Sequence, residues 1–168
     1  MILKKMTNRN LDVVCSSPVG VPGSLELLDR FRDRLAERYT GTYLENAEAR
    51  LRSVEEAPLC ALPYSESDGS GGIYAMLWRL AEQAGTGLRI DLKKIPILQE
   101  TVEICNTLDV DPYTITSDLL LCLSTDGAYL SESLREQGYP NAYVIGKTSE
   151  DNKRLICYDD TERFLTRP

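Results

Sequence analysis

Residues 65–92 read SESDGSGGIYAMLWRLAEQAGTGLRIDL and join a glycine-rich loop to a helical pattern and a strand pattern. Apolar residues recur at the helical period from Ile73 to Leu80, and Gly85 stands close to the expected end of the helix. The segment LRIDL then reads as a short strand. This succession predicts a domain in which strands and helices alternate.

The glycine-rich loop has two interpretations. Backbone amides in the first turn of a helix lack partners and carry positive charge, so glycines there would let a phosphate approach. Against a phosphate site, the loop lacks a following lysine and the GxGxxG spacing, and it contains Glu66 and Asp68. The alternative is a flexible lead into the helix, and the local sequence leaves both open. The candidate phosphate or cleft loop consists of Ser67, Asp68, Gly69, Ser70, Gly71 and Gly72.

The rest of the chain continues the alternation. The run LLLCLS at 119–124 is too continuously apolar for an exposed strand, so we expect it inside a sheet. Ser24 is expected to cap the helix that follows it. The remaining expected elements are strands at 11–16, 143–146 and 154–158 and helices at 25–39, 44–54, 96–110 and 128–137.

This pattern predicts an α/β fold, or a two-layer α+β fold, with a mixed sheet and helices packed on one face. Residues 1–10 are expected to be an N-terminal tail or short lead-in, and residues 11–168 a single domain. The sequence contains no internal repeat, linker or low-complexity segment.

Composition limits the possible partners. The formal net charge of −7 would repel nucleic acids and anionic membranes, so neither is expected as a partner. The sequence has no apolar run of the roughly 20 residues that span a bilayer, and its first residues, MILKKMTNRN, do not resemble a signal peptide. We therefore expect a cytoplasmic protein.

Histidine is absent, which excludes histidine-based triads and most transition-metal sites, and no metal site is expected. The cysteines are odd in number, form no CxxC pair and lie in mostly apolar surroundings, so we expect them to be reduced and buried. They stand at positions 15, 60, 105, 122 and 157.

A family resemblance rests on residues 95–113, IPILQETVEICNTLDVDPY, followed by TSDLLLCLS. This run resembles the C-terminal domain of the aminoimidazole ribonucleotide (AIR) synthase-related, or PurM-like, superfamily. It is most similar to the hydrogenase-maturation branch. The paired glycines stand where that family has an Asp-x-Thr-(Glu or Arg)-Gly-Gly motif, and the similarity extends over roughly residues 11–160.

The resemblance implies chemistry that this chain completes only in part. Members bind ATP on an N-terminal domain and phosphorylate an amide-like oxygen in a cleft shared with the C-terminal domain. The motif's Asp, Thr and Glu or Arg fall on Ser67, Gly69 and Ser70, so only Gly71 and Gly72 are retained. No cofactor is therefore expected for the chain alone, and ATP with magnesium only if a partner chain completes the site.

Two further family features differ. Ser117 and Asp118 occupy a turn at which the family has a glycine, and a left-handed backbone is expected at Asp118. Hydrogenase-maturation enzymes end in a cysteine that carries the group being dehydrated, whereas this sequence ends FLTRP. Cys157 lies in an expected strand and is not assigned that role. The catalytic residues stay unknown.

Two functions of different classes remain open. The chain is either a non-catalytic interaction or regulatory module, or half of a split ATP-dependent maturation or biosynthetic enzyme. The first favours a homodimer, because the face that a missing domain would cover needs a partner. The second requires a separate chain that resembles the N-terminal domain. We favour the first, because several motif positions have changed together.

Three other groups of residues have ordinary structural explanations. Glu100 and Glu103 could pair as acid and base, although helix surfaces commonly carry such carboxylates. Asp159 and Asp160 could bind a hard cation but more simply end a strand in solvent. Aromatic residues that could line a pocket or edge the core are Tyr39, Tyr43 and Tyr64.

Overall fold

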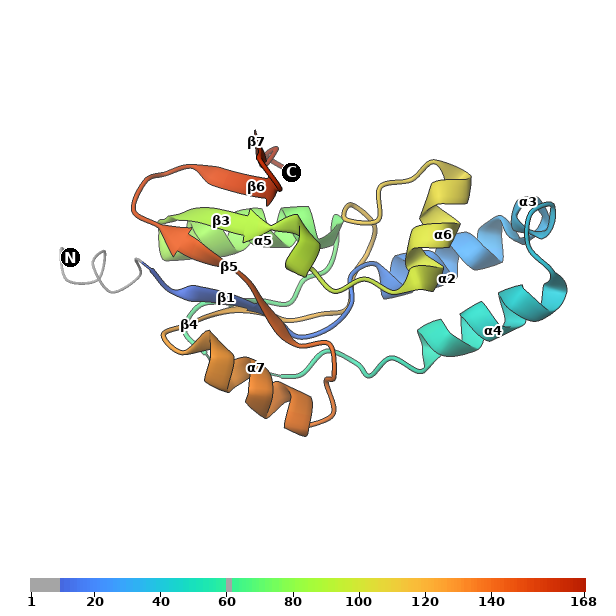
Figure 1. Cartoon of the computed structure of the whole chain (residues 1–168), viewed down its shortest axis with the longest axis horizontal. Helices are drawn as coiled ribbons and strands as arrows, with labels where there is room; N and C mark the ends of the chain where they lie inside the picture. The colour runs from blue at the N-terminus through green and yellow to red at the C-terminus, as the bar shows by residue number, and fades with distance from the viewer. Residues whose placement is uncertain (1–9, 60–61) are drawn as a thin grey trace.

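The computed structural model describes residues 10–59 and 62–168. Within these residues the strands form one mixed sheet in the order β2-β4-β1-β5-β3-β6-β7 (Figure 1). Neighbouring strands are antiparallel except β3 and β6, which are parallel. The strands are β1 Asp12–Cys15, β2 Ser65–Glu66, β3 Gly87–Asp91, β4 Leu121–Ser124, β5 Tyr143–Ser149, β6 Arg154–Tyr158 and β7 Thr161–Phe164.

The helices fall between the strands along most of the chain. They are α2 Val21–Arg30, α3 Arg32–Ala36, α4 Gly41–Arg52, α5 Gly72–Ala84, the short 3-10 helix η1 Leu92–Lys94, α6 Gln99–Leu108 and α7 Gly127–Glu136. In the described part of the chain, none of the helices has the length and apolar character needed to cross a membrane.

Strand β4 shows why the sheet is covered on both faces. Leu121 and Leu123 belong to the core beneath α5, whereas Cys122 belongs to a second core beneath α7. Successive side chains of a strand point to opposite faces of the sheet, so a continuously apolar strand is buried on both faces. The α/β class and the mixed sheet are confirmed, but the expectation of helices on one face is corrected, because α7 packs on the face opposite α5.

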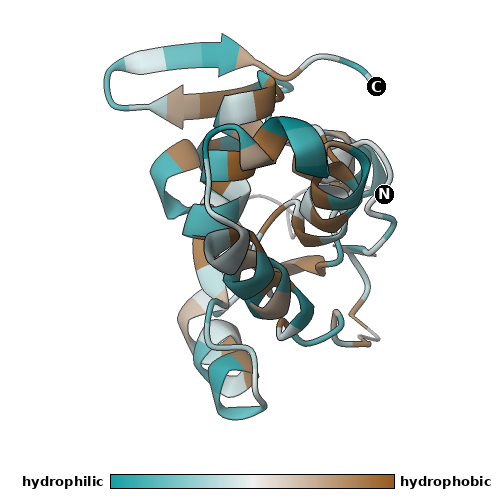
Figure 2. Ribbon diagram, turned by 90° about the vertical axis from the view of Figure 1, so that its right-hand side faces the viewer, coloured by the Kyte–Doolittle hydropathy of each residue, from teal (hydrophilic) through white to brown (hydrophobic). Residues whose placement is uncertain are grey.

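A third apolar cluster lies beside the sheet rather than on it. Helices α2, α3, α4 and α6 gather at one end of the molecule (Figure 1) and bury Leu28, Leu35, Leu44 and Ile104. Figure 2 looks at this side and shows hydrophilic and hydrophobic residues alternating along these helices. That alternation gives each helix one apolar stripe for the cluster.

Some local expectations differ from the structure. Helix α2 begins at Val21 with Gly20 as its N-cap, and Ser24 lies inside the helix, where its hydroxyl donates to the Gly20 carbonyl at 2.6 Å. The single helix expected at 25–39 breaks at Phe31 into α2 and α3. Strands β2 and β7 were not expected, because β2 has only two residues and β7 is exposed along its length.

Candidate functional site

The candidate phosphate loop, residues 67–72, connects β2 to α5. Gly71 is the N-cap of α5 and has φ +80°, and Gly72 follows with φ +76°. Side-chain-bearing residues rarely adopt this left-handed backbone, which explains why two glycines stand at the start of the helix. The loop therefore does lead into the helix that the sequence predicts.

The loop packs directly against the second candidate segment, Ser117 and Asp118. The Ser117 amide donates to the Gly69 carbonyl at 3.1 Å, and a Cβ atom on Gly69 would lie 1.6 Å from the Ser117 carbonyl oxygen. Similarly, a Cβ atom on Gly72 would lie 2.4 Å from the carbonyl oxygen of Tyr113. The structure thus brings the two candidate segments together, with no room for side chains between them.

The left-handed backbone expected at Asp118 is wrong. Among the described residues that are not glycine, positive φ occurs at Asn10, Asp109 and Asp159 only. The chain turns earlier, where the Thr114 amide donates to the Asp111 carbonyl. The Asp118 carboxylate instead accepts from the Ala57 amide at 3.4 Å, as the chain runs straight into β4.

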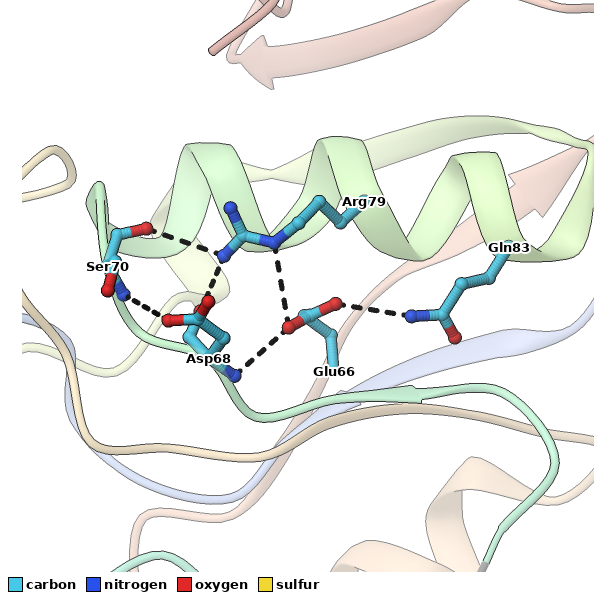
Figure 3. Close-up of polar contacts among 5 residues, drawn as sticks. All are labelled: Glu66, Asp68, Ser70, Arg79 and Gln83. Carbon is cyan, nitrogen blue, oxygen red and sulfur yellow. Dashed lines mark hydrogen bonds and ion pairs between the residues drawn. The ribbon is translucent and has the colours of Figure 1, made fainter.

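The carboxylates of Glu66 and Asp68 accept hydrogen bonds from two amides of the loop (Figure 3). Asp68 accepts from the amide of Ser70 at 3.0 Å, and Glu66 accepts from the amide of Asp68 at 3.0 Å. The amide of Gly72 donates to the Gly69 carbonyl at 3.1 Å. The hydrogen bond from the Ser70 backbone is the main reason why the pKa of Asp68 lies below its ordinary value. The carboxylate therefore stays charged where a bound anion would be expected.

Arg79 of α5 also bonds to the loop. Its guanidinium donates to the carbonyls of Asp68 and Ser70, at 2.5 and 3.4 Å, and its Nε lies 3.6 Å from Glu66 Oε1 (Figure 3). Gln83, one turn further along α5, donates to Glu66 Oε2 at 3.2 Å. The Arg79 guanidinium is thus already bonded to the loop and to Glu66.

Sequence reasoning missed this role of Arg79 and Gln83. They follow the glycines by more than one helical turn, whereas a phosphate motif directs attention to a lysine directly after the loop. The available signal was their spacing of four residues, which places both on the polar face of α5.

A cleft of about 400 Å³ lies beside Gly71, between α5 and the C-terminal segment. Tyr74 forms part of its wall and stacks on Tyr113, with ring centroids 5.4 Å apart. Arg163 lies over the Tyr74 ring at 5.0 Å and donates to its hydroxyl. Burial is the largest cause that raises the pKa of Tyr74 to about 12, so its hydroxyl stays protonated. Sequence reasoning did not predict this cluster.

The other candidate residues do not converge on this loop. Tyr39 and Tyr43 stack at 4.7 Å in the helical cluster, and Asp159 pairs with Lys93. In the described part of the chain, histidine, cysteine and carboxylate side chains form no group of three or more that could hold a metal ion. Cys15, Cys105 and Cys122 are buried and Cys157 is half-buried, whereas Cys60 lies outside the described residues.

Comparisons with known proteins point to one family. The profile of the family described as AIR synthase related protein, C-terminal domain, matches residues 65–157, which include the glycine loop and β4. A protein of Methanocaldococcus jannaschii named for hydrogenase expression and formation is 33% identical over 90 residues, which are 51% of this chain and 27% of that protein. The carbamoyl dehydratase HypE of Cupriavidus necator is 27% identical over 92 residues, 51% of this chain and 26% of its own.

Solved structures show the same fold. Escherichia coli HypE superposes with a TM-score of 0.71 at 17% identity, over 98% of this chain and 52% of HypE. HypE in complex with ATP gives 0.71 at 15% identity over 95% and 51%, and HypE in the HypE-HypF complex gives 0.69 at 17% over 95% and 53%. This chain therefore spans about half the length of the HypE chains that it matches.

Proposed function

Because this chain belongs to the family described as AIR synthase related protein, C-terminal domain, we propose that it acts as a cytoplasmic, non-catalytic interaction or regulatory module. In this role it binds a partner protein and does not use ATP by itself. The proposal rests on one observation: backbone groups of the loop at the family's motif position are already bonded to the side chains of Glu66, Asp68 and Arg79.

A phosphate group would have to displace Asp68 before it could reach the amide of Ser70. It would also compete with Glu66 and two backbone carbonyls for Arg79. An isolated helix N-terminus attracts anions because its amides are unpaired, and here the amides of Asp68, Ser70 and Gly72 already have acceptors. The net charge of −7 adds a smaller, salt-dependent repulsion.

The experiment is calorimetry with Mg-ATP on the purified chain. We expect no binding tighter than about 1 mM, which corresponds to only about 4 kcal/mol of binding free energy. A dissociation constant in the low micromolar range would contradict the proposal if Gly71→Val and Gly72→Val abolish it in proteins that remain folded by circular dichroism. Those variants distinguish binding in the loop from binding elsewhere.

For the partner, we propose a second copy of this chain that pairs at the edge of the sheet. Strand β7 is the last strand in the sheet order, it is exposed along its length, and Phe164 is 68% exposed. An edge strand offers unpaired amides and carbonyls to another chain, and an exposed aromatic residue adds apolar area to the contact.

Light scattering tests this surface at micromolar concentration, where we expect the mass of a dimer. Phe164→Lys should shift the protein toward monomer. The matched control is Tyr129→Lys, which changes a 72% exposed aromatic residue on α7 and should leave the dimer intact. A monomeric wild-type chain with no co-purifying protein would rule out the dimer.

The alternative, half of a split ATP-dependent enzyme, is favoured by one observation. Gly71 and Gly72, the two motif residues that this chain retains, still form the start of α5 although the neighbouring motif positions have changed. In this case a separate chain resembling the N-terminal domain would have to restore ATP binding. Calorimetry repeated with the N-terminal half of a HypE protein added would distinguish the two, because only the split enzyme gains affinity.

A further inference from the structure

A second hollow lies away from the glycine loop, where β1 ends. Its volume is about 310 Å³, at the lower end of the roughly 300–1,000 Å³ typical of ligand pockets. Four separate parts of the chain line it: the residues that follow β1, the end of α4, the N-cap of α6 and the loop after α7. Figure 1 shows α4 and α7 on either side of the region where β1 ends.

Two buried hydroxyls form part of the pocket wall. Ser16 and Ser17 are 1% and 2% exposed, and their Oγ atoms lie 2.9 Å apart. Ser16 Oγ also accepts from the Leu120 amide at 2.9 Å. Each hydroxyl carries one proton, and their mutual bond uses only one of the two. No hydrogen bond between described residues accounts for the second proton, and a buried donor without an acceptor is unfavourable.

Charges of both signs stand beside these hydroxyls. Arg50 and Glu55 line the pocket, and neither belongs to any ion pair between described residues. Leu98, the N-cap of α6, also lines the pocket. Its side chain cannot accept a hydrogen bond from the amides in the first turn of that helix. Helix amides and a guanidinium favour an anionic group, whereas the carboxylate favours a cationic one.

We propose that this pocket binds a small zwitterion of the α-amino acid class. The ligand carboxylate accepts the remaining serine proton and pairs with Arg50, and the ligand ammonium pairs with Glu55. A phosphate would satisfy the hydroxyls and the arginine equally well but would meet repulsion from Glu55. A neutral molecule would use neither charge.

The test is amide-resolved NMR titration of the full chain with three probes: sodium acetate, inorganic phosphate and a panel of free α-amino acids. At least one amino acid should bind saturably and shift the amides of Ser16, Ser17 and Leu98. Acetate should bind about tenfold more weakly, because it lacks the ammonium group. If no amino acid saturates these shifts, or if phosphate binds most tightly, the proposal is overturned.

Variants assign the roles of the side chains. Ser17→Ala and Arg50→Gln should each weaken amino-acid binding about tenfold. Glu55→Gln should weaken amino-acid binding, whereas acetate binding should stay the same or become tighter because a repulsive charge is removed, and this difference tests the zwitterion directly. The control is Arg34→Gln, which removes an exposed arginine on α3 and should leave both ligands unaffected. Equal affinities in all four variants would overturn the proposal, and the variants at exposed Arg50 and Glu55 keep the test valid if Ser17→Ala unfolds the chain.

Discussion

The glycine loop and the pocket at the end of β1 contain similar residues but differ in how their polar groups are satisfied. The glycine loop has serines, carboxylates and an arginine that bond to one another. The pocket has serines, a carboxylate and an arginine, and one hydroxyl proton and both charges remain without a described partner. A sequence motif therefore indicates where a family places its site. The hydrogen bonds within the folded chain indicate which polar groups remain available to a ligand.

The largest expected effect follows from the closest contact in the glycine loop. Gly69→Ala should destabilise the protein by at least about 3 kcal/mol, because its Cβ would overlap the Ser117 carbonyl oxygen and force the backbone apart. Urea unfolding measures the loss. The control Gly41→Ala, at a helix start with nothing within 4 Å, should change stability by less than about 1 kcal/mol. Similar losses in both variants would show that the loop is not tightly packed.

The next prediction concerns Cys15, which precedes the two serines of the pocket at the end of β1. Its thiol donates to the Ser17 carbonyl at 3.3 Å. Burial raises the pKa of Cys15 from 9.0 to about 12, so at a given pH roughly 1,000-fold less thiolate is present. Alkylation at pH 8, followed by mass spectrometry, should therefore be slowed by at least that factor in the native state relative to urea. Half-buried Cys157 serves as the internal control. Rapid native labelling of Cys15 would mean that the pocket opens to the core.

A smaller effect is expected from the cation that holds the glycine loop. Arg79→Gln should cost about 1–2 kcal/mol, because it removes the ion pair to Glu66 and the hydrogen bonds to two carbonyls. Urea unfolding and a phosphate titration should show lower stability with no gain in affinity. Arg52→Gln removes a more exposed arginine, paired with Glu48 at 3.1 Å, and should cost less. If phosphate affinity falls in Arg79→Gln, the loop already binds anions. The difference drawn between the glycine loop and the pocket at the end of β1 would then be wrong.

The smallest effect is the pH dependence of Asp68. Its pKa is lower in the folded chain than the ordinary 3.8, so its contribution to stability is present above pH 3.8 and is lost as pH falls through the lowered value. The stability difference between wild type and Asp68→Asn should accordingly shrink between pH 5 and pH 3, when measured as urea midpoints. Asp33→Asn, at an exposed carboxylate of α3, is the control. A difference that grows on acidification would contradict the assignment.

The fold could be predicted where the pattern is long or continuous. Residues of α5 follow the helical period, and the apolar run of β4 predicts an interior strand, as the structure confirms. The family resemblance is confirmed as well. The second covered face was missed because an apolar run shows that a strand is buried but not which helices cover it. Strand β7 was missed because its exposed sequence, TERF, carries no apolar alternation.

The candidate site could be predicted only in its backbone. Paired glycines before a helical pattern predict a helix start, and α5 begins at Gly72, whereas the left-handed conformation of Gly71 and Gly72 is known only from the structure. The partners of Glu66 and Asp68 depend on which side chain of α5 lies over the loop, and this information is tertiary. The same holds for the pocket at β1, because Ser17, Arg50 and Asn141 meet only after the sheet has formed.

The interior position of β1 in the sheet also determines when the chain can fold during synthesis. Its neighbours are β4 and β5, so Asp12 pairs with Ser124 and with Lys147, more than 100 residues later. A nascent chain therefore exposes Val13 and Val14 to solvent or to a chaperone until β5 leaves the ribosome. At about 5–20 residues per second, the roughly 135 residues that separate Asp12 from Lys147 take about 7–27 s to synthesise, an interval in which an unpaired apolar strand is prone to aggregate. Translation speed and chaperone supply should affect the yield of folded protein more than equilibrium stability does.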